Sequence, residues 1–343
     1  MRRFALVRIA ACTFFCGVAL VLSFGNGYGE EIRVKVANWY AVGHKQDLLM
    51  RNFCEELEKR AGGKLKVKYY PASTLVNTVQ QYDAVVKGIA DIGNHVLGYT
   101  MGRFPFSQIL DFPLGFPQGG GPTMIANEFY KKFRSKEFDE VKVLWFHAQP
   151  AGFLHTKTRP VAKLEDIKGL KLRCYGSNAK FVSLLGAAPV AMPMGDVYDA
   201  LSKGVVDGLL SSYESLYGWK TGEHVRYSTE NRDSAYSAVF LVMMNKKKFA
   251  ALSPDTQALI DRMSEEYTTK YAQMWADQSM VAFDWLKKRG VKMINLSKDE
   301  EARWYEKGAK PLVDQYIKEM NSAGLPGEQA VRFIQDTLKR YKK

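Results

Sequence analysis

The residue best placed for chemistry in this sequence is Arg173, at the end of a short alternating stretch, Leu170–Arg173. Alternation of apolar and polar residues is typical of a strand, and a loop at Tyr175–Asn178 follows it. A guanidinium group offers two parallel N–H donors, which match the two oxygens of a carboxylate. Arg173 is therefore a candidate anchor for an anionic ligand. The alternative is an arginine that only faces water at the end of a strand.

The sequence around Arg173 predicts alternating strands and helices, as in a parallel α/β sheet. After the strand come an apolar-periodic helix that closes at Gly186, a second short strand at Ala188–Met192 and a helix at Val197–Lys203. Short connections between alternating strands and helices predict parallel strands. Ligands of such sheets bind beyond the carboxyl ends of the strands, which is where Arg173 lies.

The other reactive side chains form no catalytic or metal-binding pattern. The sequence contains neither G-x-S-x-G nor H-E-x-x-H, and His44, His147, His155 and His224 lack the spacing of a metal cluster or a catalytic triad. We therefore expect a protein that is not an enzyme and that holds no metal and no cofactor.

Size and composition predict a globular protein of two domains. The chain has 343 residues, of which 46% are hydrophobic and 25% charged. The formal net charge of +13 could indicate a nucleic-acid partner. However, no helix-turn-helix, zinc-finger or RNA-binding motif occurs, and most lysines are scattered. We interpret the charge as a solubility feature and expect no nucleic-acid partner.

The N-terminus has the pattern of a secretory signal peptide. An arginine-containing start precedes an apolar stretch, Ile9–Phe24, and small residues at Gly27–Gly29. The apolar stretch is too short for a stable membrane span. We expect residues 1–29 to be removed, with cleavage near Gly29, and the mature chain to be periplasmic. A lipidated Cys12 and an uncleaved anchor are the alternatives.

Two of the four cysteines, Cys12 and Cys16, would leave with this segment. Cys54 and Cys174 remain, in different elements far apart in the sequence. They could pair in an oxidising compartment or stay free.

The order of elements resembles the solute-binding subunit of tripartite ATP-independent periplasmic (TRAP) transporters, of the dicarboxylate-binding type. The resemblance covers about residues 31–290. It includes a Y-P-x-x-x-L turn at Tyr70–Leu75 and a G-x-A-D-I-G segment at Gly88–Gly93. Its most specific part is an ordered set of matching residues: Leu164–Lys168, Gly169–Arg173, Gly186, Pro189, Val190, Met192–Pro193, Val197–Leu201 and Gly204–Gly208.

The resemblance implies an α/β, two-lobed periplasmic-binding-protein fold, type II-like, with a ligand cleft between the lobes and a long spine helix from Ser253 to about Arg289. Lobe I would consist of residues 30–152 plus 239–282, and lobe II of residues 153–238 plus 283–343. A monomer of this kind captures a small organic acid and delivers it to the TRAP membrane permease. A secreted hydrolase and a sensory ligand-binding protein are the alternatives from other classes.

The resemblance also implies that Arg173 pairs with the carboxylate of the ligand. The other candidate ligand-binding residues are Asn38, Trp39, Asn77, His95, Met194, Ser211, Tyr213 and Glu214. For Trp39 and Met194 the alternative is packing, and for His95 it is an ordinary capped residue. Glu214 could meet a ligand hydroxyl or amine, or face water.

The segment after Gly208 departs from the family pattern. Many relatives carry a polar Q-E-N-P sequence here, whereas this chain has Leu209, Leu210, Ser211 and Ser212. An unmatched hydroxyl buried against apolar walls costs about 1–3 kcal/mol. We therefore expect a monocarboxylate with an apolar or aromatic body, such as a 2-oxo acid, rather than a sugar acid. The alternative is that the two leucines face the core and leave only Ser211 at the cleft.

Overall fold

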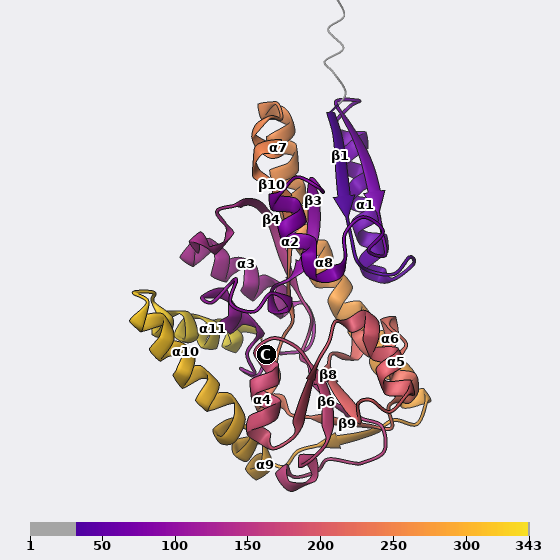
Figure 1. The fold of residues 1–343 in the computed structure, drawn as a ribbon, viewed down its shortest axis with the longest axis vertical. Helices are drawn as coiled ribbons and strands as arrows, with labels where there is room; N and C mark the ends of the chain where they lie inside the picture. Colours follow the sequence, from indigo (N-terminus) through magenta and orange to yellow (C-terminus); the bar gives the residue numbers. More distant parts are fainter. Residues whose placement is uncertain (1–31, 342–343) are drawn as a thin grey trace, which may run out of the picture.

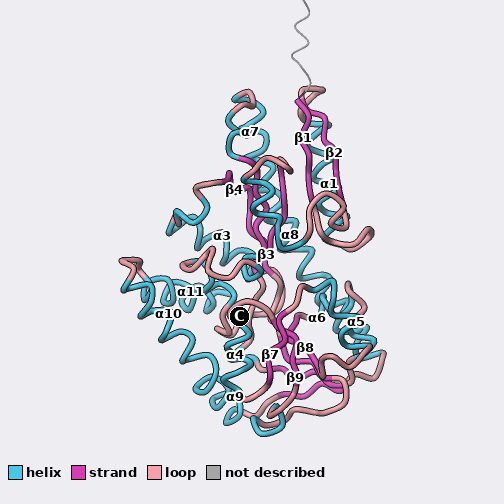
Figure 2. Tube along the Cα trace, viewed as in Figure 1, coloured by secondary structure: helices cyan, strands magenta, loops and turns pink. Residues whose placement is uncertain are grey.

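The computed structural model describes residues 32–341. The expected signal peptide, with Cys12 and Cys16, lies outside the described residues. Two groups of strands, each surrounded by helices, form two lobes (Figures 1 and 2). The first lobe, lobe I, is built on a five-stranded sheet of order β2-β1-β3-β10-β4, and lobe II on a six-stranded sheet of order β11-β9-β5-β8-β6-β7.

Lobe I is formed mainly by the first part of the chain. Its strands are β1 (Ile32–Ala37), β2 (Leu65–Tyr70), β3 (Ile92–Val96), β4 (Val141–Ala148) and β10 (Val239–Asn245), and its helices are α1 (Lys45–Arg60), α2 (Gln81–Val86), α3 (Gly121–Phe133) and α7 (Lys246–Ala250). Strand β10 enters the sheet from lobe II and pairs antiparallel with β3 and β4. All seven of its residues are buried, which explains its continuous apolar sequence.

Lobe II contains the segment around Arg173. Its strands are β5 (Phe153–Thr156), β6 (Lys171–Cys174), β7 (Ala188–Ala191), β8 (Gly208–Ser211), β9 (Tyr227–Glu230) and β11 (Lys292–Asn295), and its helices are α4 (Asn178–Leu185), α5 (Val197–Ser202) and α6 (Tyr213–Gly218). Strand β6 pairs in parallel with β7 and β8, so the predicted parallel arrangement is confirmed there. The sheet as a whole is mixed, because β5 runs antiparallel to β8 and β9.

The predicted spine helix is present as α8 (Pro254–Lys288), a helix of 35 residues. Ser253 caps its N-terminus by accepting a hydrogen bond from the backbone N–H of Thr256. At 1.5 Å per residue the helix is about 52 Å long. It packs against α1, α3 and β4 in lobe I and against α6 in lobe II, and therefore supports both lobes (Figure 1).

The chain ends with α9 (Lys298–Trp304), α10 (Lys310–Ser322) and α11 (Gly327–Tyr341). A π-helical turn, Tyr305–Ala309, separates the first two. Gly308 in this turn packs closely on Phe181, since a Cβ there would lie 2.6 Å from its ring. Helix α11 returns to α3 of lobe I, where the Tyr341 hydroxyl donates to Glu128.

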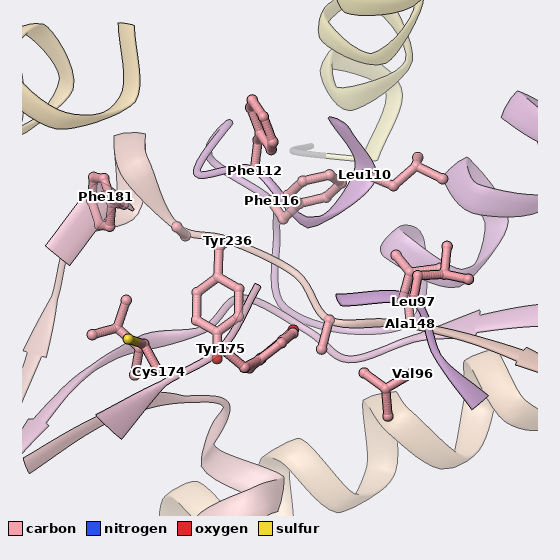
Figure 3. Close-up of a cluster of buried hydrophobic side chains, with 14 of the residues drawn as sticks. Val96, Leu97, Leu110, Phe112, Phe116, Ala148, Cys174, Tyr175, Phe181 and Tyr236 are labelled. Carbon is pink, nitrogen blue, oxygen red and sulfur yellow. The ribbon is translucent and has the colours of Figure 1, made fainter. Parts of the chain in front are cut away.

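Two strand-like crossovers run side by side between the lobes. Gly152 and Tyr236 form an antiparallel bridge, with a backbone hydrogen bond of 2.8 Å, and Gln149 N donates to Ala238 O at 2.9 Å. One cluster of buried apolar side chains extends across both lobes at this level. Figure 3 shows part of it, with Tyr175 and Tyr236 at its centre. The lobes are therefore in direct contact beside the crossovers.

Cys54 and Cys174 are both free and buried. Within residues 32–341, no cluster of three or more histidine, cysteine or acidic side chains is suited to hold a metal ion.

None of the helices between residues 32 and 341 has both the length and the apolar character needed to cross a membrane.

Candidate functional site

A small cavity of about 30 Å³ lies where the two lobes meet. Its aromatic lining residues are Trp39, Tyr40, Tyr99, Tyr175, Trp219, Tyr236, Phe240 and Trp275, and its other lining residues are Val96, Gln149, Arg173, Met194, Ser211, Glu214, Ser215 and Ala238. These residues come from both lobes, from the crossovers and from α8. Mostly apolar walls with a few placed polar groups are typical of small-molecule sites, but the cavity is smaller than the about 300–1,000 Å³ of such sites. An organic ligand therefore requires the two lobes to move apart.

Arg173 is a buried cation in this cavity, with 2% of its surface exposed. Its Nε and Nη2 donate to the Met192 carbonyl oxygen at 3.1 and 3.0 Å. The guanidinium carbon lies 5.3 Å from the centre of the Tyr175 ring. Among residues 32–341, no carboxylate forms an ion pair with Arg173, and its Nη1 makes no hydrogen bond. A buried charge without a counter-ion is unfavourable, so this end of the cavity suits an anion.

Aromatic rings form the body of the cavity. Trp39 stacks on Tyr40 with 3.9 Å between ring centroids and on Trp219 with 5.6 Å. Phe240 stacks on Trp275 at 5.8 Å, which extends this surface to the spine helix. Flat apolar walls of this kind match the faces of a planar ligand.

The second charged residue in the cavity is Glu214, in the first turn of α6. Its side chain is buried, and burial raises the pKa of its carboxyl group to about 8. One carboxyl oxygen, Oε1, lies 3.5 Å from Nε2 of His44 in lobe I. Burial lowers the pKa of His44 to about 4. At neutral pH the imidazole is therefore uncharged and the acid is mostly protonated.

Tyr99 connects the lobes beside Arg173. Its hydroxyl, carried by the turn after β3 of lobe I, accepts hydrogen bonds from the backbone N–H of Met194 at 3.0 Å and from Arg173 Nη2 at 3.4 Å. Both donors belong to lobe II. The side chain that would hold a ligand anion is thus also part of the contact between the lobes.

Five of the nine predicted ligand-binding residues line the cavity. They are Trp39, Arg173, Met194, Ser211 and Glu214.

The other four lie outside the lining and have structural partners. Asn38 donates to the Tyr69 hydroxyl at 2.9 Å, and exposed Asn77 caps a short helical turn. His95 is hydrogen-bonded to Thr100 at 2.9 Å. The Tyr213 hydroxyl donates to Glu230, on another face of lobe II.

The apolar wall of the cavity is not formed by Leu209 and Leu210, although this was expected. Leu209 and Leu210 are buried but do not line the cavity, so the alternative that they face the core is correct. The lining residues that sequence reasoning missed as site residues are Val96, Tyr99, Gln149, Tyr175, Ser215, Trp219, Tyr236, Ala238, Phe240 and Trp275. Most of them lie near a strand end or a crossover, whereas Ser215 and Trp219 belong to α6 and its C-cap and Trp275 lies in the middle of α8.

Two lobes joined by crossovers, with a cation and aromatic walls in the cavity between them, define a solute-binding protein. Residues 37–319 match the bacterial extracellular solute-binding proteins of family 7, the DctP family, and the chain belongs to this family. The family consists of solute-binding proteins rather than enzymes. Its TRAP members are periplasmic and work with membrane permease subunits.

Three relatives illustrate the range of the family. A TRAP periplasmic solute-binding protein from Desulfovibrio salexigens is 30% identical, with a TM-score of 0.80, over 91% of this chain and 97% of that one. A marine-metagenome TRAP solute-binding protein specific for aromatic acid ligands, solved with metahydroxyphenylacetate, is 28% identical, with a TM-score of 0.84, over 91% and 100%. The 2,3-diketo-L-gulonate-binding periplasmic protein of Escherichia coli is 27% identical over 73% of this chain and 76% of its own length. This protein is therefore a TRAP solute-binding protein.

Proposed function

We propose that this protein captures a monocarboxylate with an aromatic body, such as an aromatic 2-oxo acid, and delivers it to a TRAP membrane permease. The observation that carries the proposal is the pairing of one buried cation, Arg173, with walls made of aromatic rings. The carboxylate would accept from Nη1 of the guanidinium group, because Nε and Nη2 already donate to the Met192 carbonyl oxygen and the Tyr99 hydroxyl. The ring of the ligand would lie against Trp39 and Phe240.

The composition of the cavity supports a single carboxylate. Arg173 is the only lysine or arginine side chain in the described lining. A second carboxylate would meet Glu214 or an aromatic wall, where it would lose its hydration without gaining a cation. The specificity of the marine-metagenome relative for aromatic acids supports the same ligand class.

A binding panel tests the proposal. We expect benzoate, phenylacetate and phenylglyoxylate to raise the melting temperature of the purified protein, and calorimetry to give tighter binding for the best of them than for succinate or glucuronate. Tightest binding by succinate or by glucuronate would refute the aromatic ligand class. Mass spectrometry of small molecules released from the denatured protein provides an independent measurement.

The same panel separates the alternatives from other classes. A secreted hydrolase would turn over ester or amide substrates without being stabilised by free acids. A transport role further requires that growth on the bound acid depends on the genes for this protein and a permease. Binding without such dependence would favour a sensory protein.

A further inference from the structure

Three polar atoms at the Glu214 end of the cavity have no hydrogen-bond partner within residues 32–341. The Tyr40 hydroxyl, Trp39 Nε1 and His44 Nε2 are all buried and unpaired. The Glu214 carboxyl group makes no hydrogen bond either, and its closest polar approach is the 3.5 Å contact with His44. Buried polar groups in folded proteins are nearly always paired. Gln149 Nε2 and the Tyr175 hydroxyl, elsewhere in the lining, are also unpaired, and Tyr175 lies beside Arg173. The unpaired groups around Glu214 indicate one place for a polar atom of the ligand, separate from Tyr175.

This polar group of residues lies across the aromatic wall from Arg173. Trp39 has Tyr99 on one side, with ring centroids 6.3 Å apart, and Tyr99 contacts Arg173. The Trp39 ring also stacks on Trp219, whose ring is 5.4 Å from His44. Among residues 32–341 Glu214 has an ion-pair contact with His44 and none with Arg173. The cation and the acid therefore act on different parts of a ligand.

The hydrogen-bonding roles at this end can be assigned from the local structure. His44 caps α1, where its Nδ1 accepts from the backbone N–H of Gln46 at 3.2 Å. The neutral imidazole therefore carries its proton on Nε2, which points toward Glu214. A protonated carboxyl group can both donate and accept. Gly218 leaves the space for this pair, because a Cβ there would lie 2.4 Å from His44 Nε2 and 3.1 Å from Glu214 Oε1.

We propose that Glu214, together with His44 and Tyr40, forms a second subsite that recognises a hydroxyl group on the ring of the aromatic acid. This inference rests on the proposed function, in which Arg173 holds the carboxylate. A hydroxyl group is favoured because it can donate to one of these groups and accept from another without bringing a charge into the aromatic cavity. The ligand class thereby becomes the hydroxy-substituted aromatic monocarboxylates.

Matched ligand pairs test the proposal. Calorimetry at pH 7 would compare benzoate with 3- and 4-hydroxybenzoate, and phenylacetate with 3- and 4-hydroxyphenylacetate. We expect at least one hydroxylated acid to bind about tenfold tighter than its parent. In Glu214→Leu the ratio between the two affinities should fall to about one. In Glu214→Gln, whose neutral amide also donates and accepts, most of the ratio should remain.

A control variant and further ligands separate failure of the hydroxyl subsite from failure of the proposed function. Glu223→Leu, in the same lobe but outside the cavity, should leave the ratio unchanged, and melting curves should show that each variant is folded. Binding of aromatic acids with a ratio near one in the natural protein would refute the hydroxyl subsite but not the proposed function. Failure of every aromatic acid to bind would refute the proposed function itself. Tighter binding of 4-(aminomethyl)benzoate or of isophthalate than of every hydroxylated acid would also overturn the proposal, because Glu214 would then serve a cation or a second acid.

Discussion

Replacing Tyr99 by phenylalanine tests whether closure of the lobes is coupled to ligand binding. The change removes one hydroxyl group and keeps the ring. That hydroxyl accepts from Met194 N at 3.0 Å and from Arg173 at 3.4 Å, and both bonds join lobe I to lobe II. The first is an ordinary buried hydrogen bond, and the second is long but has a charged donor. Together they contribute about 1–3 kcal/mol to the closed form.

This energy has a direct consequence for affinity. A ligand held between two lobes binds the closed form better than the open form, so any loss of closed-form stability appears in the dissociation constant. A loss of about 1–3 kcal/mol corresponds to about a 5- to 150-fold weaker affinity. We also expect faster ligand dissociation and, at equal ligand concentration, a larger fraction of open molecules.

The assay is calorimetry combined with small-angle X-ray scattering, with and without saturating ligand. The natural protein should contract on binding, and Tyr99→Phe should need more ligand for the same contraction. The control is Tyr316→Phe, which removes a buried hydrogen bond of 2.7 Å to the Phe106 carbonyl oxygen, away from the cavity. It should lower the melting temperature without changing affinity. The reasoning fails if Tyr99→Phe binds as tightly as the natural protein, or if ligand leaves the scattering profile of the natural protein unchanged.

Three further predictions concern single residues or groups. Arg173→Ala should weaken ligand binding by about 2–5 kcal/mol. Arg173→Lys should also bind the ligand poorly, because an ammonium group cannot reproduce the planar fork of donors of a guanidinium group. A calorimetric affinity of Arg173→Ala within threefold of the affinity of the natural protein would remove Arg173 from the site. Burial raises the pKa of Asp111 to about 8, so the folded state holds an extra proton above pH 4. Unfolding free energy should therefore decrease as pH rises from about 4 to 8, by at most about 5 kcal/mol from this group. Urea titrations should show a smaller decrease in Asp111→Asn, and equal slopes would contradict this assignment. Burial lowers the pKa of His95 to about 3 and of His155 to about 4, so the unfolded state binds more protons below pH 6.5. The contribution of these two histidines to stability should accordingly fall as pH drops from 6.5 toward 4, opposite in sign to that of Asp111, and His155→Gln should remove part of this contribution from the pH dependence of the melting temperature.

Local patterns were sufficient to place Arg173. Its strand, its loop and the next helix are encoded within a few residues of each other, and the structure pairs β6 in parallel with β7 and β8 as expected. The spine helix was also expected, from its start at Ser253 and Pro254 and from the resemblance to the TRAP solute-binding subunits, and the structure has it as α8. The position of such a strand, loop or helix is determined mainly by residues that are close to it in the sequence.

The rest of the site depends on tertiary contacts that leave no local pattern. Tyr99 and Trp219 reach the cavity from opposite lobes, and nothing near either residue in the sequence indicates that both lie beside Trp39. The four-residue strand β8 is buried on both faces, so its apolar residues could not be divided between cavity and core. Consecutive helical residues point about 100° apart, which explains why Glu214 faces the cavity while Tyr213 packs on the other side.

The two buried thiols make the folded chain nearly inert toward thiol reagents. Cys174 is fully buried and its pKa is raised to about 11, and burial raises the pKa of Cys54 further. Maleimides and disulfides react with the thiolate, which is scarce at both positions at neutral pH. A chain that begins at residue 30 could therefore receive one new surface cysteine on α1 and one on α5 without loss of its natural cysteines. Fluorescent dyes attached there would report the distance between the lobes in single molecules.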